Sequence, residues 1–217
     1  MQTTRVLLVD DHAVVRTGYR RLLELEPDLK VVGEHADADD AYRGLQAAAQ
    51  GQEGPGVDVM VLDLSMPGRS GLDLLRRVQA RWEGLKVLVF SMHDSPAMVD
   101  QALKAGADGF VGKSSEPEEL IHAVREVAQG RRYLASGLSE QLAADQSAQA
   151  PHRQLSSREF DVLRYLLQGL TVEEVSQRMS LSLKTVANYQ TAIRQKLGVS
   201  TAVELLRYAR EHGLEVA

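Results

Sequence analysis

The first 130 residues repeat one pattern five times, in which a short apolar run is followed by a stretch of helical periodicity. The apolar runs lie at residues 5–9, 31–32, 57–62, 86–90 and 109–111. The helical stretches follow at residues 12–26, 39–50, 70–82, 96–105 and 117–129. Short apolar runs bounded by turn residues are typical of strands buried on both faces, as in a parallel sheet. The alternation therefore predicts an α/β fold with a doubly wound, five-stranded parallel sheet.

Polar residues stand at the ends of four of the five predicted strands. They are Asp10-Asp11, Asp63, Ser91 and Lys113. A single Asp after a strand often only starts a turn, and Met66-Pro67-Gly68 soon after Asp63 predicts such a break in regular structure. However, the carboxyl ends of parallel strands meet at one edge of the sheet, where open α/β folds bind their ligands. We therefore expect these groups to converge.

Three converging carboxylates are costly unless a cation neutralises them. With oxygen ligands alone on offer, a hard cation such as magnesium fits best. A carboxylate beside magnesium, a lysine and a hydroxyl is a plausible phosphoryl acceptor, since it is already ionised at pH 7. His12 is not expected to be a metal ligand, because it begins a predicted helix and no second histidine stands near it.

Composition divides the chain in two. Residues 1–130 carry 14 Lys/Arg and 21 Asp/Glu, whereas residues 152–217 carry 9 and 7, and the whole chain has a net charge of −5. The acidic part would repel a polyanion and the C-terminal part would not.

The absence of cysteine excludes disulfides and thiolate metal sites. No apolar run is long enough for a membrane span, and the N-terminus lacks signal-peptide features. We predict a soluble cytoplasmic protein.

The residues after 130 change character. Residues 131–153 are expected to form a linker, with one or two helical turns at 138–144 and a flexible tether at 145–153. The remaining part, 154–217, contains only helix signals. Ser156, Thr171 and Thr201 each precede a glutamate by three residues, as in a capping box, and Ser182 can cap a further helix. Two helices joined by a tight turn suit a helix-turn-helix, although a plain helical bundle would show the same spacing.

Several motifs of the first 130 residues together resemble the receiver domain of a two-component response regulator, a flavodoxin-like fold. These are Val9-Asp10-Asp11-His12, Asp63-Leu64-Ser65-Met66-Pro67-Gly68, Ser91 and Gly109-Phe110-Val111-Gly112-Lys113. The resemblance implies that Asp63 is the phosphoacceptor.

The same resemblance implies roles for the residues around Asp63. Asp11 and Asp63 would bind magnesium directly, Asp10 would assist through water, and the main-chain carbonyl of Ser65 would be a third protein ligand. Lys113 would pair with the phosphoryl group and Ser91 would move to hydrogen-bond it. Phe110 occupies the aromatic switch position, where the family often has tyrosine.

The C-terminal motifs resemble the LuxR-type DNA-binding domain. They are Leu155-Ser156-Ser157-Arg158-Glu159, Val162-Leu163, Gly169-Leu170-Thr171, Leu181-Ser182, Thr185-Val186 and 193–199. Behind a receiver domain, they make the chain similar to the NarL/FixJ family of transcriptional regulators. The resemblance implies a helix-turn-helix domain of four helices, promoter DNA as a partner and a homodimer on activation.

The recognition helix carries the expected DNA contacts, which are Lys184, Thr185, Asn188, Tyr189, Thr191, Arg194 and Lys196. Asn188 is expected to read adenine, and Thr191 to touch a thymine methyl or a phosphate. Lys184, Arg194 and Lys196 are expected to contact phosphates. Ala187 and Tyr189 stand where the family usually has Lys and His, and Val172-Glu173 replaces a common Asn-Lys. Fewer cationic contacts predict weak non-specific binding that depends on dimerisation.

The resulting hypothesis is a phosphorylation-controlled transcription factor, not an enzyme, whose Asp63 receives phosphate from a histidine kinase. Two alternatives stay open. A magnesium-dependent phosphotransferase would also use an aspartyl-phosphate, but it would need a second carboxylate where this chain has Ser65. A receiver that works without phosphorylation would keep the DNA-binding role, but it would not need the full acidic set.

Overall fold

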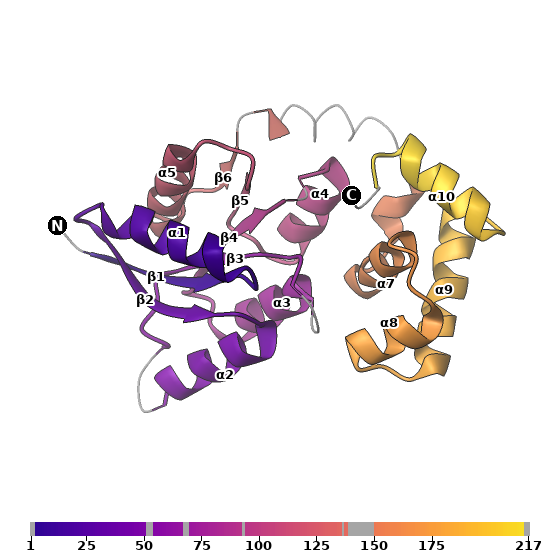
Figure 1. The fold of residues 1–217 in the computed structure, drawn as a ribbon, viewed down its shortest axis with the longest axis horizontal. Coiled ribbons are helices and arrows are strands. Elements are labelled where there is room, and N and C mark those ends of the chain that lie inside the picture. The colour runs from indigo at the N-terminus through magenta and orange to yellow at the C-terminus, as the bar shows by residue number, and fades with distance from the viewer. Residues whose placement is uncertain are drawn as a thin grey trace. The chain divides into compact units, whose positions relative to one another are not determined.

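The computed structural model describes residues 3–50, 54–66, 70–92, 94–135, 137–138 and 150–214 (Figure 1). The chain divides into two compact units, one formed by residues 1–94 and 102–139 and the other by residues 95–101 and 140–217. The predicted break at 67–68, most of the predicted helical turns at 138–144 and the tether up to residue 149 lie outside the described residues.

The first unit contains a parallel sheet of six strands. These are β1 (Thr4–Val9), β2 (Leu29–His35), β3 (Val59–Leu62), β4 (Lys86–Ser91), β5 (Gly109–Gly112) and β6 (Tyr133–Leu134). Their order across the sheet is β2-β1-β3-β4-β5-β6, and every neighbouring pair is parallel. The doubly wound parallel sheet is thus confirmed, and its first five strands follow the flavodoxin-like order.

Two strands differ from their prediction. β6 lies in the segment assigned to the linker, because two residues are too short to show any periodicity. β2 is longer than the predicted Val31–Val32. It lies at the edge of the sheet, so Lys30, Gly33 and Glu34 interrupt its apolar run without being buried on both faces.

Helices cover both faces of this sheet. They are α1 (Ala13–Glu24), α2 (Ala38–Ala48), α3 (Gly71–Arg81) and α5 (Pro117–Ala128). α4 (Pro96–Lys104) is divided between the two units, with its residues up to 101 in the second. α1 and α5 lie together on one face (Figure 1), where Leu23 and Val124 pack against strand residues such as Val6, Val61 and Phe90. The helix starts have ordinary causes, since the Ser70 side chain caps α3 and Pro117 begins α5.

One glycine in α2 marks a close approach to β2. A Cβ added to Gly44 would lie 2.6 Å from Nε2 of His35, so the histidine ring occupies the place of a side chain. The ring is also held by Asp40, whose Oδ2 lies 2.6 Å from His35 Nδ1. Glycine in a helix interior costs up to about 1 kcal/mol relative to alanine. Here it allows α2 to pack onto the end of β2.

The second unit is helical within its described residues. It contains a short 3-10 helix η1 (Pro151–Gln154), α7 (Ser157–Leu167), α8 (Val172–Met179), α9 (Leu183–Leu197) and α10 (Ala202–Glu211). The three predicted capping boxes are present at α7, α8 and α10, and the Ser182 side chain caps α9. Buried Val175, Val186 and Ile193 place α8 and α9 against a common core.

α8 and α9 are joined by the turn Ser180–Ser182, as expected for a helix-turn-helix. Ser180 adopts a left-handed conformation with φ of +54°, which is uncommon for a residue other than glycine. The amide of Leu181 donates to the carbonyl of Ser176 at 2.9 Å and closes the end of α8. The two helices are therefore set at their angle by a three-residue connection.

η1 belongs to the helical unit, although the sequence placed residues 151–153 in the tether. His152 is only 2% exposed. Its main-chain amide and its Nδ1 lie 3.2 and 3.1 Å from the Tyr208 hydroxyl, on α10. The sequence around Pro151 shows no helical signal. Neither η1 nor the burial of His152 could therefore be predicted. Within the described part of the chain, no helix is both long and apolar enough to cross a bilayer.

Candidate functional site

The carboxyl ends of β1, β3, β4 and β5 bring together the polar residues predicted there. Asp10 and Asp63 directly follow β1 and β3, Ser91 is the last residue of β4, and Lys113 directly follows β5. The main-chain amide of Lys113 donates to the carbonyl of Ser91 at 2.8 Å, which extends the ladder between β4 and β5 to the site. The predicted convergence is therefore a property of the sheet's register.

Lys113 links the two carboxylates that follow β1 and β3. Its Nζ lies 2.6 Å from Oδ2 of Asp63 and 2.6 Å from Oδ2 of Asp10. The side chains of Lys113 and Asp63 are only 4% and 1% exposed. Burial by itself lowers the pKa of Lys113, but attraction to Asp63 and Asp10 outweighs it and the pKa is raised. The ammonium is therefore charged and held against the proposed acceptor.

The main chain around Asp63 fixes its carboxylate. Oδ1 accepts a hydrogen bond from the amide of Ser65 at 2.9 Å, while Oδ2 faces Lys113. A Cβ added to Gly71 would lie 2.5 Å from the Asp63 carbonyl and 2.7 Å from Cα of Leu64. Only glycine lets α3 begin this close to the acceptor. Ser65 contacts Asp63 through its amide, whereas the resemblance assigns the metal-ligand role to its carbonyl.

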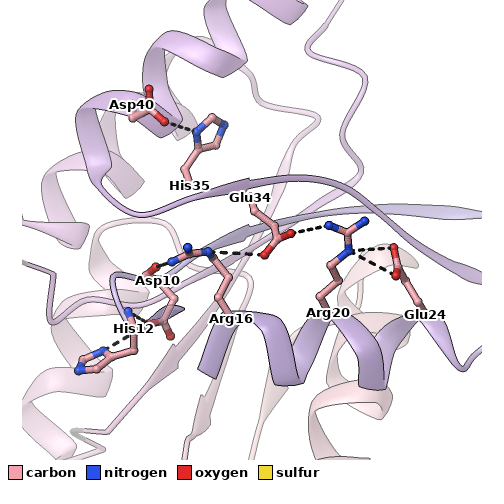
Figure 2. A network of polar contacts seen from close by, with 8 residues as sticks. All are labelled: Asp10, His12, Arg16, Arg20, Glu24, Glu34, His35 and Asp40. Atoms are coloured by element: carbon pink, nitrogen blue, oxygen red, sulfur yellow. Dashed lines mark hydrogen bonds and ion pairs between the residues drawn. The ribbon is translucent and has the colours of Figure 1, made fainter. Parts of the chain in front are cut away.

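The loop after β1 adds two more groups to the site. Oδ1 of Asp10 accepts from the amide of His12 at 2.8 Å (Figure 2). Oδ1 of Asp11 is buried without a hydrogen bond and lies 3.0 Å from Nδ1 of His12. One ligand atom each of Asp10, Asp11, His12 and Asp63 lies within 4.8 Å of the others. Sequence reasoning had set His12 aside, and the structure places its ring beside the acidic pair.

The donor set fits a hard divalent cation. Three carboxylates and one ammonium leave two net negative charges in a buried site. Such a concentration of charge is costly without a counter-charge, and an orphaned carboxylate oxygen on Asp11 is available as a ligand. Oxygen donors of this kind are what magnesium prefers. Receiver domains generally bind Mg²⁺ at an acidic pocket of this composition.

Ser91 and Phe110 are the two predicted switch residues. Both side chains are fully buried. Phe110 lies on β5 opposite Val89 of β4, three residues before Lys113. It packs inward as expected of an aromatic residue without a hydroxyl.

The predicted recognition helix α9 presents one exposed stripe. Lys184, Ala187, Asn188, Thr191 and Gln195 are exposed, at the three- and four-residue spacing of a helix face. Gln195 was missed by sequence reasoning, although the same spacing from Thr191 points to it. The stripe carries one cation, Lys184, and its other side chains are neutral.

The other predicted DNA contacts differ in how far their side chains are buried and hydrogen-bonded. Thr185 and Tyr189 are partly buried, and the Thr185 hydroxyl lies 2.7 Å from that of Ser182. The Thr191 hydroxyl donates to the carbonyl of Ala187 at 3.0 Å. Arg194 is partly buried, and its Nε is buried without a hydrogen-bond partner.

Lys196 is engaged within the helical unit. Its Nζ lies 2.7 Å from Oε2 of Glu159 and 3.2 Å from the carbonyl of Gln154. Glu159 is the capping-box residue of α7, and the ion pair therefore ties the end of α9 to the start of α7. A phosphate contact from Lys196 would have to break or share this pair.

Comparisons with known proteins agree with both halves of this description. The family model of the response regulator receiver domain matches residues 6–125. The model of the bacterial regulatory proteins of the luxR family matches residues 153–209. The transcriptional regulatory protein UhpA of Salmonella typhimurium is 45% identical over 200 residues, which cover 92% of this chain and 94% of that protein.

Solved structures of RcsB resemble this chain along nearly its whole length. RcsB of Salmonella enterica serovar Typhimurium, bound to promoter P1flhDC in the presence of phosphomimetic BeF3−, is 27% identical with a TM-score of 0.76. That likeness covers 97% of this chain and 100% of the RcsB chain. A structure of two RcsB dimers bound to two parallel DNAs is 27% identical with a TM-score of 0.61, covering 96% and 98% of the two chains. The chain therefore belongs to the NarL/FixJ family of response regulators and is a transcriptional regulator with a receiver domain followed by a LuxR-type DNA-binding domain.

Proposed function

We propose that a partner histidine kinase phosphorylates this protein on Asp63, and that phosphorylation controls the pairing of two copies on promoter DNA. The observation that carries the proposal is the buried cluster at the sheet edge, where Lys113 bridges Asp63 and Asp10 at 2.6 Å each. A receiver domain accepts phosphate from a histidine kinase, and such a cluster supplies both the nucleophile and its compensating charge.

The phosphoryl transfer follows from the groups around Asp63. A carboxylate oxygen of Asp63 attacks the phosphorus of the phosphohistidine, a P–O bond forms, and the P–N bond breaks to return the histidine, which takes up a proton. The Lys113 ammonium lies on the carboxylate and offsets negative charge on the arriving group. The amide of Ser65 holds the second carboxylate oxygen, which fixes the direction of attack.

We propose that Asp11 and Asp63 hold Mg²⁺ directly, that Asp10 assists through water, and that the Ser65 carbonyl completes the protein ligands. When bound, the ion neutralises charge on the phosphoryl oxygens and the carboxylates. The orphaned Asp11 oxygen and the net charge of the cluster support this assignment. His12 lies beside these atoms, and we assign it no ligand role.

The phosphorylated state is read by Ser91 and Phe110. Ser91 is joined to Lys113 through the main chain, and its hydroxyl is proposed to bond the phosphoryl group. Phe110 lies on β5, three residues before Lys113, and is proposed to shift within the core when Ser91 moves. A local change of charge thus biases a two-state element.

We propose domain limits of 1–130 for the receiver, 131–153 for the linker and 154–217 for the DNA-binding domain, with η1 packed on the latter. α9 would enter the major groove. Asn188 would contact a base, Thr191 a thymine methyl or a phosphate, and Lys184 and Arg194 phosphates. The remaining candidates Thr185, Tyr189 and Lys196 are proposed as flanking contacts.

The RcsB complexes with DNA and its dimers support a dimeric, DNA-bound active form. A regulator of a bacterial promoter works where the chromosome lies, and we therefore propose that this protein is cytoplasmic. We propose a regulatory rather than an enzymatic role, since its one phosphoryl transfer modifies the protein itself.

Sedimentation of the protein with Mg²⁺, in the presence and absence of beryllofluoride, tests the proposal. Beryllofluoride mimics a phosphoryl group on aspartate, and Asp63→Asn removes its attachment point. We expect a shift from monomer to dimer in the wild type with beryllofluoride and no shift in Asp63→Asn.

The controls separate the parts of this proposal. If neither protein shifts although Mg²⁺ binds, the assay is repeated with DNA fragments selected from a random library. A beryllofluoride-dependent dimer on DNA would then support control at Asp63. Equal DNA binding by Asp63→Asn and the wild type with beryllofluoride would overturn it in favour of a receiver that works without phosphorylation.

A further inference from the structure

Arg16, in the first turns of α1, contacts the main chain of the acidic site. Its Nη1 donates a hydrogen bond to the carbonyl oxygen of Asp10 at 2.5 Å (Figure 2). Its side chain is 18% exposed, against 48% for Arg20 one turn later on the same helix. The side chain of Arg16 therefore reaches from α1 to the end of β1.

The carbonyl that Arg16 binds is the first main-chain group beyond the hydrogen bonds between β1 and β2. The amide of Asp10 makes the last bond to β2, donating to the carbonyl of His35 at 3.1 Å. The next group along the chain is the Asp10 carbonyl, which lies beyond the sheet ladder. Because the peptide unit is planar, fixing this carbonyl fixes the plane that joins Asp10 to Asp11. Arg16 thus restrains the peptide plane that ends at Cα of Asp11, from which the Asp11 side chain leaves the main chain.

The charge of Arg16 is compensated by a row of alternating charges. Glu34 of β2 lies between two arginines, with Oε2 3.5 Å from Arg16 Nε and Oε1 2.7 Å from Arg20 Nη1. Arg20 also contacts Glu24 at 3.3 Å, as Figure 2 shows. An uncompensated cation beside Asp10 would repel a bound metal ion. Glu34 therefore lets Arg16 hold the loop at a reduced electrostatic cost to the site.

We infer that Arg16 is a positioning residue of the acidic site, which aligns Asp10 and Asp11 for a divalent cation through the Asp10 carbonyl. The inference rests on the proposed function, which places Mg²⁺ at Asp10, Asp11 and Asp63. A positioning role and a purely electrostatic role of Arg16 predict opposite changes in Mg²⁺ affinity. Removing a positive charge would by itself tighten Mg²⁺ binding, whereas loss of alignment weakens it.

The experiment measures Mg²⁺ affinity in the full chain, from the dependence of the unfolding temperature on Mg²⁺ concentration. The proteins are the wild type, Arg16→Gln, Arg20→Gln and Glu34→Gln, each at low and at high ionic strength. Arg20→Gln is the matched control, because Arg20 shares the helix, the residue type and the partner Glu34 but does not contact Asp10.

We expect Arg16→Gln to bind Mg²⁺ about tenfold more weakly at both ionic strengths, as for other residues that orient metal ligands. Arg20→Gln should stay within about twofold of the wild type, since exposed charge pairs contribute little. Glu34→Gln should weaken binding at low ionic strength only, because it exposes the charge of Arg16 to an interaction that salt screens. Affinity in Arg16→Gln equal to or tighter than that of the wild type would overturn the inference.

Arg16→Lys keeps the test decisive if Arg16→Gln folds poorly. Lysine keeps the charge but has one nitrogen, which cannot bond the Asp10 carbonyl and face Glu34 as two guanidinium nitrogens do. We expect Arg16→Lys to bind Mg²⁺ several-fold more weakly than the wild type, whereas a charge effect alone predicts equal affinity. If the wild type itself bound no Mg²⁺, the proposed metal site would fail and this inference with it. Binding by the wild type with no change in either Arg16 variant would reject the inference alone.

Discussion

The acidic site of the receiver and the exposed stripe of α9 are opposite kinds of functional surface. In the acidic site, Asp63 is 1% exposed and both of its oxygens have partners within the chain. On α9, Asn188 and Lys184 are exposed and no contact within the described residues restrains their side chains. The first surface is shaped before its ligand arrives, and the second acquires its geometry from DNA.

This difference shows which kind of site can be assigned from a structure that holds no ligand. Most buried polar groups are hydrogen-bonded, so the Asp11 oxygen, which has no hydrogen bond and lies 3.0 Å from His12, is a candidate ligand atom. An exposed side chain has water as a partner and carries no such signal. The comparison predicts that substitutions at the acidic site change folding stability, whereas those on the α9 stripe change DNA binding alone.

Lys113→Ala should have the largest effect and is the strongest test of this division. It leaves the buried carboxylates of Asp63 and Asp10 facing each other, and breaking a buried ion pair costs about 3–5 kcal/mol. The free energy of unfolding, measured with urea, should fall by that order without Mg²⁺, and Mg²⁺ should restore more stability in the variant than in the wild type. Lys30→Ala, at an exposed position of β2, is the control and should change little.

Glu159→Gln tests a partly buried ion pair within the helical unit, because its partner Lys196 lies on α9, the helix that carries the exposed stripe. Burial by itself raises the pKa of Glu159, but hydrogen bonds from Lys196 and the Ser156 amide lower it below its ordinary value. A carboxyl whose folded pKa is lowered stabilises the fold above its unfolded pKa and loses that contribution as pH falls through the folded value.

At pH 7 we therefore expect Glu159→Gln to lower the free energy of unfolding by about 1.5 kcal/mol, the scale of a hydrogen bond to a charged group. The gap to the wild type should narrow as pH falls from about 4.3, the unfolded pKa, through the lower folded pKa. Unfolding at several pH values measures it, with the exposed Glu173→Gln as the control. If the difference in free energy of unfolding between wild type and variant stayed constant with pH, ionisation of Glu159 would not contribute to stability.

Asn188→Ala should leave stability within about 0.5 kcal/mol, as for exposed positions. Its effect should appear in discrimination between the selected operator and variants of one base pair, which would fall by about 1–3 kcal/mol at a single position. Fluorescence anisotropy with labelled duplexes measures both affinities, and Gln168→Ala at the exposed C-cap of α7 is the control. A uniform loss over all sequences would assign Asn188 to the phosphate backbone instead.

Ala187→Lys should have the smallest effect on the fold and a general effect on binding. It adds a cation to the stripe, where the family usually has lysine. Each additional phosphate contact steepens the slope of log affinity against log salt by about 0.9. Titrations at several salt concentrations should show this steeper slope for all sequences, whereas Leu25→Lys, which adds the same charge at the exposed C-cap of α1, should not.

The sequence predicted most of the receiver fold because each strand and helix carries its own periodic signal. The strand-end residues were found for the same reason, since parallel strands place their ends at one edge. What could not be predicted depends on partners distant in sequence. Lys196 contacts Glu159, 37 positions away, and Arg16 contacts a main-chain carbonyl that no side-chain pattern reveals.

Short elements were also beyond prediction. The two residues of β6 and the four of η1 are too few to show a period, and their structure comes from neighbours. His152 is buried against Tyr208, although nothing in residues 145–153 distinguishes it from a tether residue. In both cases, tertiary contacts formed by a longer element decide the local conformation.

The fit between His35 and Gly44 has a consequence for how this protein can change over evolutionary time. Because the ring is held by Asp40 and fills the space above the glycine, a side chain cannot be added at position 44 while His35 keeps its place. A lineage that acquires a side chain at 44 must first replace His35 by a smaller residue, and the reverse order is closed to it. The two positions form one inherited unit, and related sequences should show them changing together.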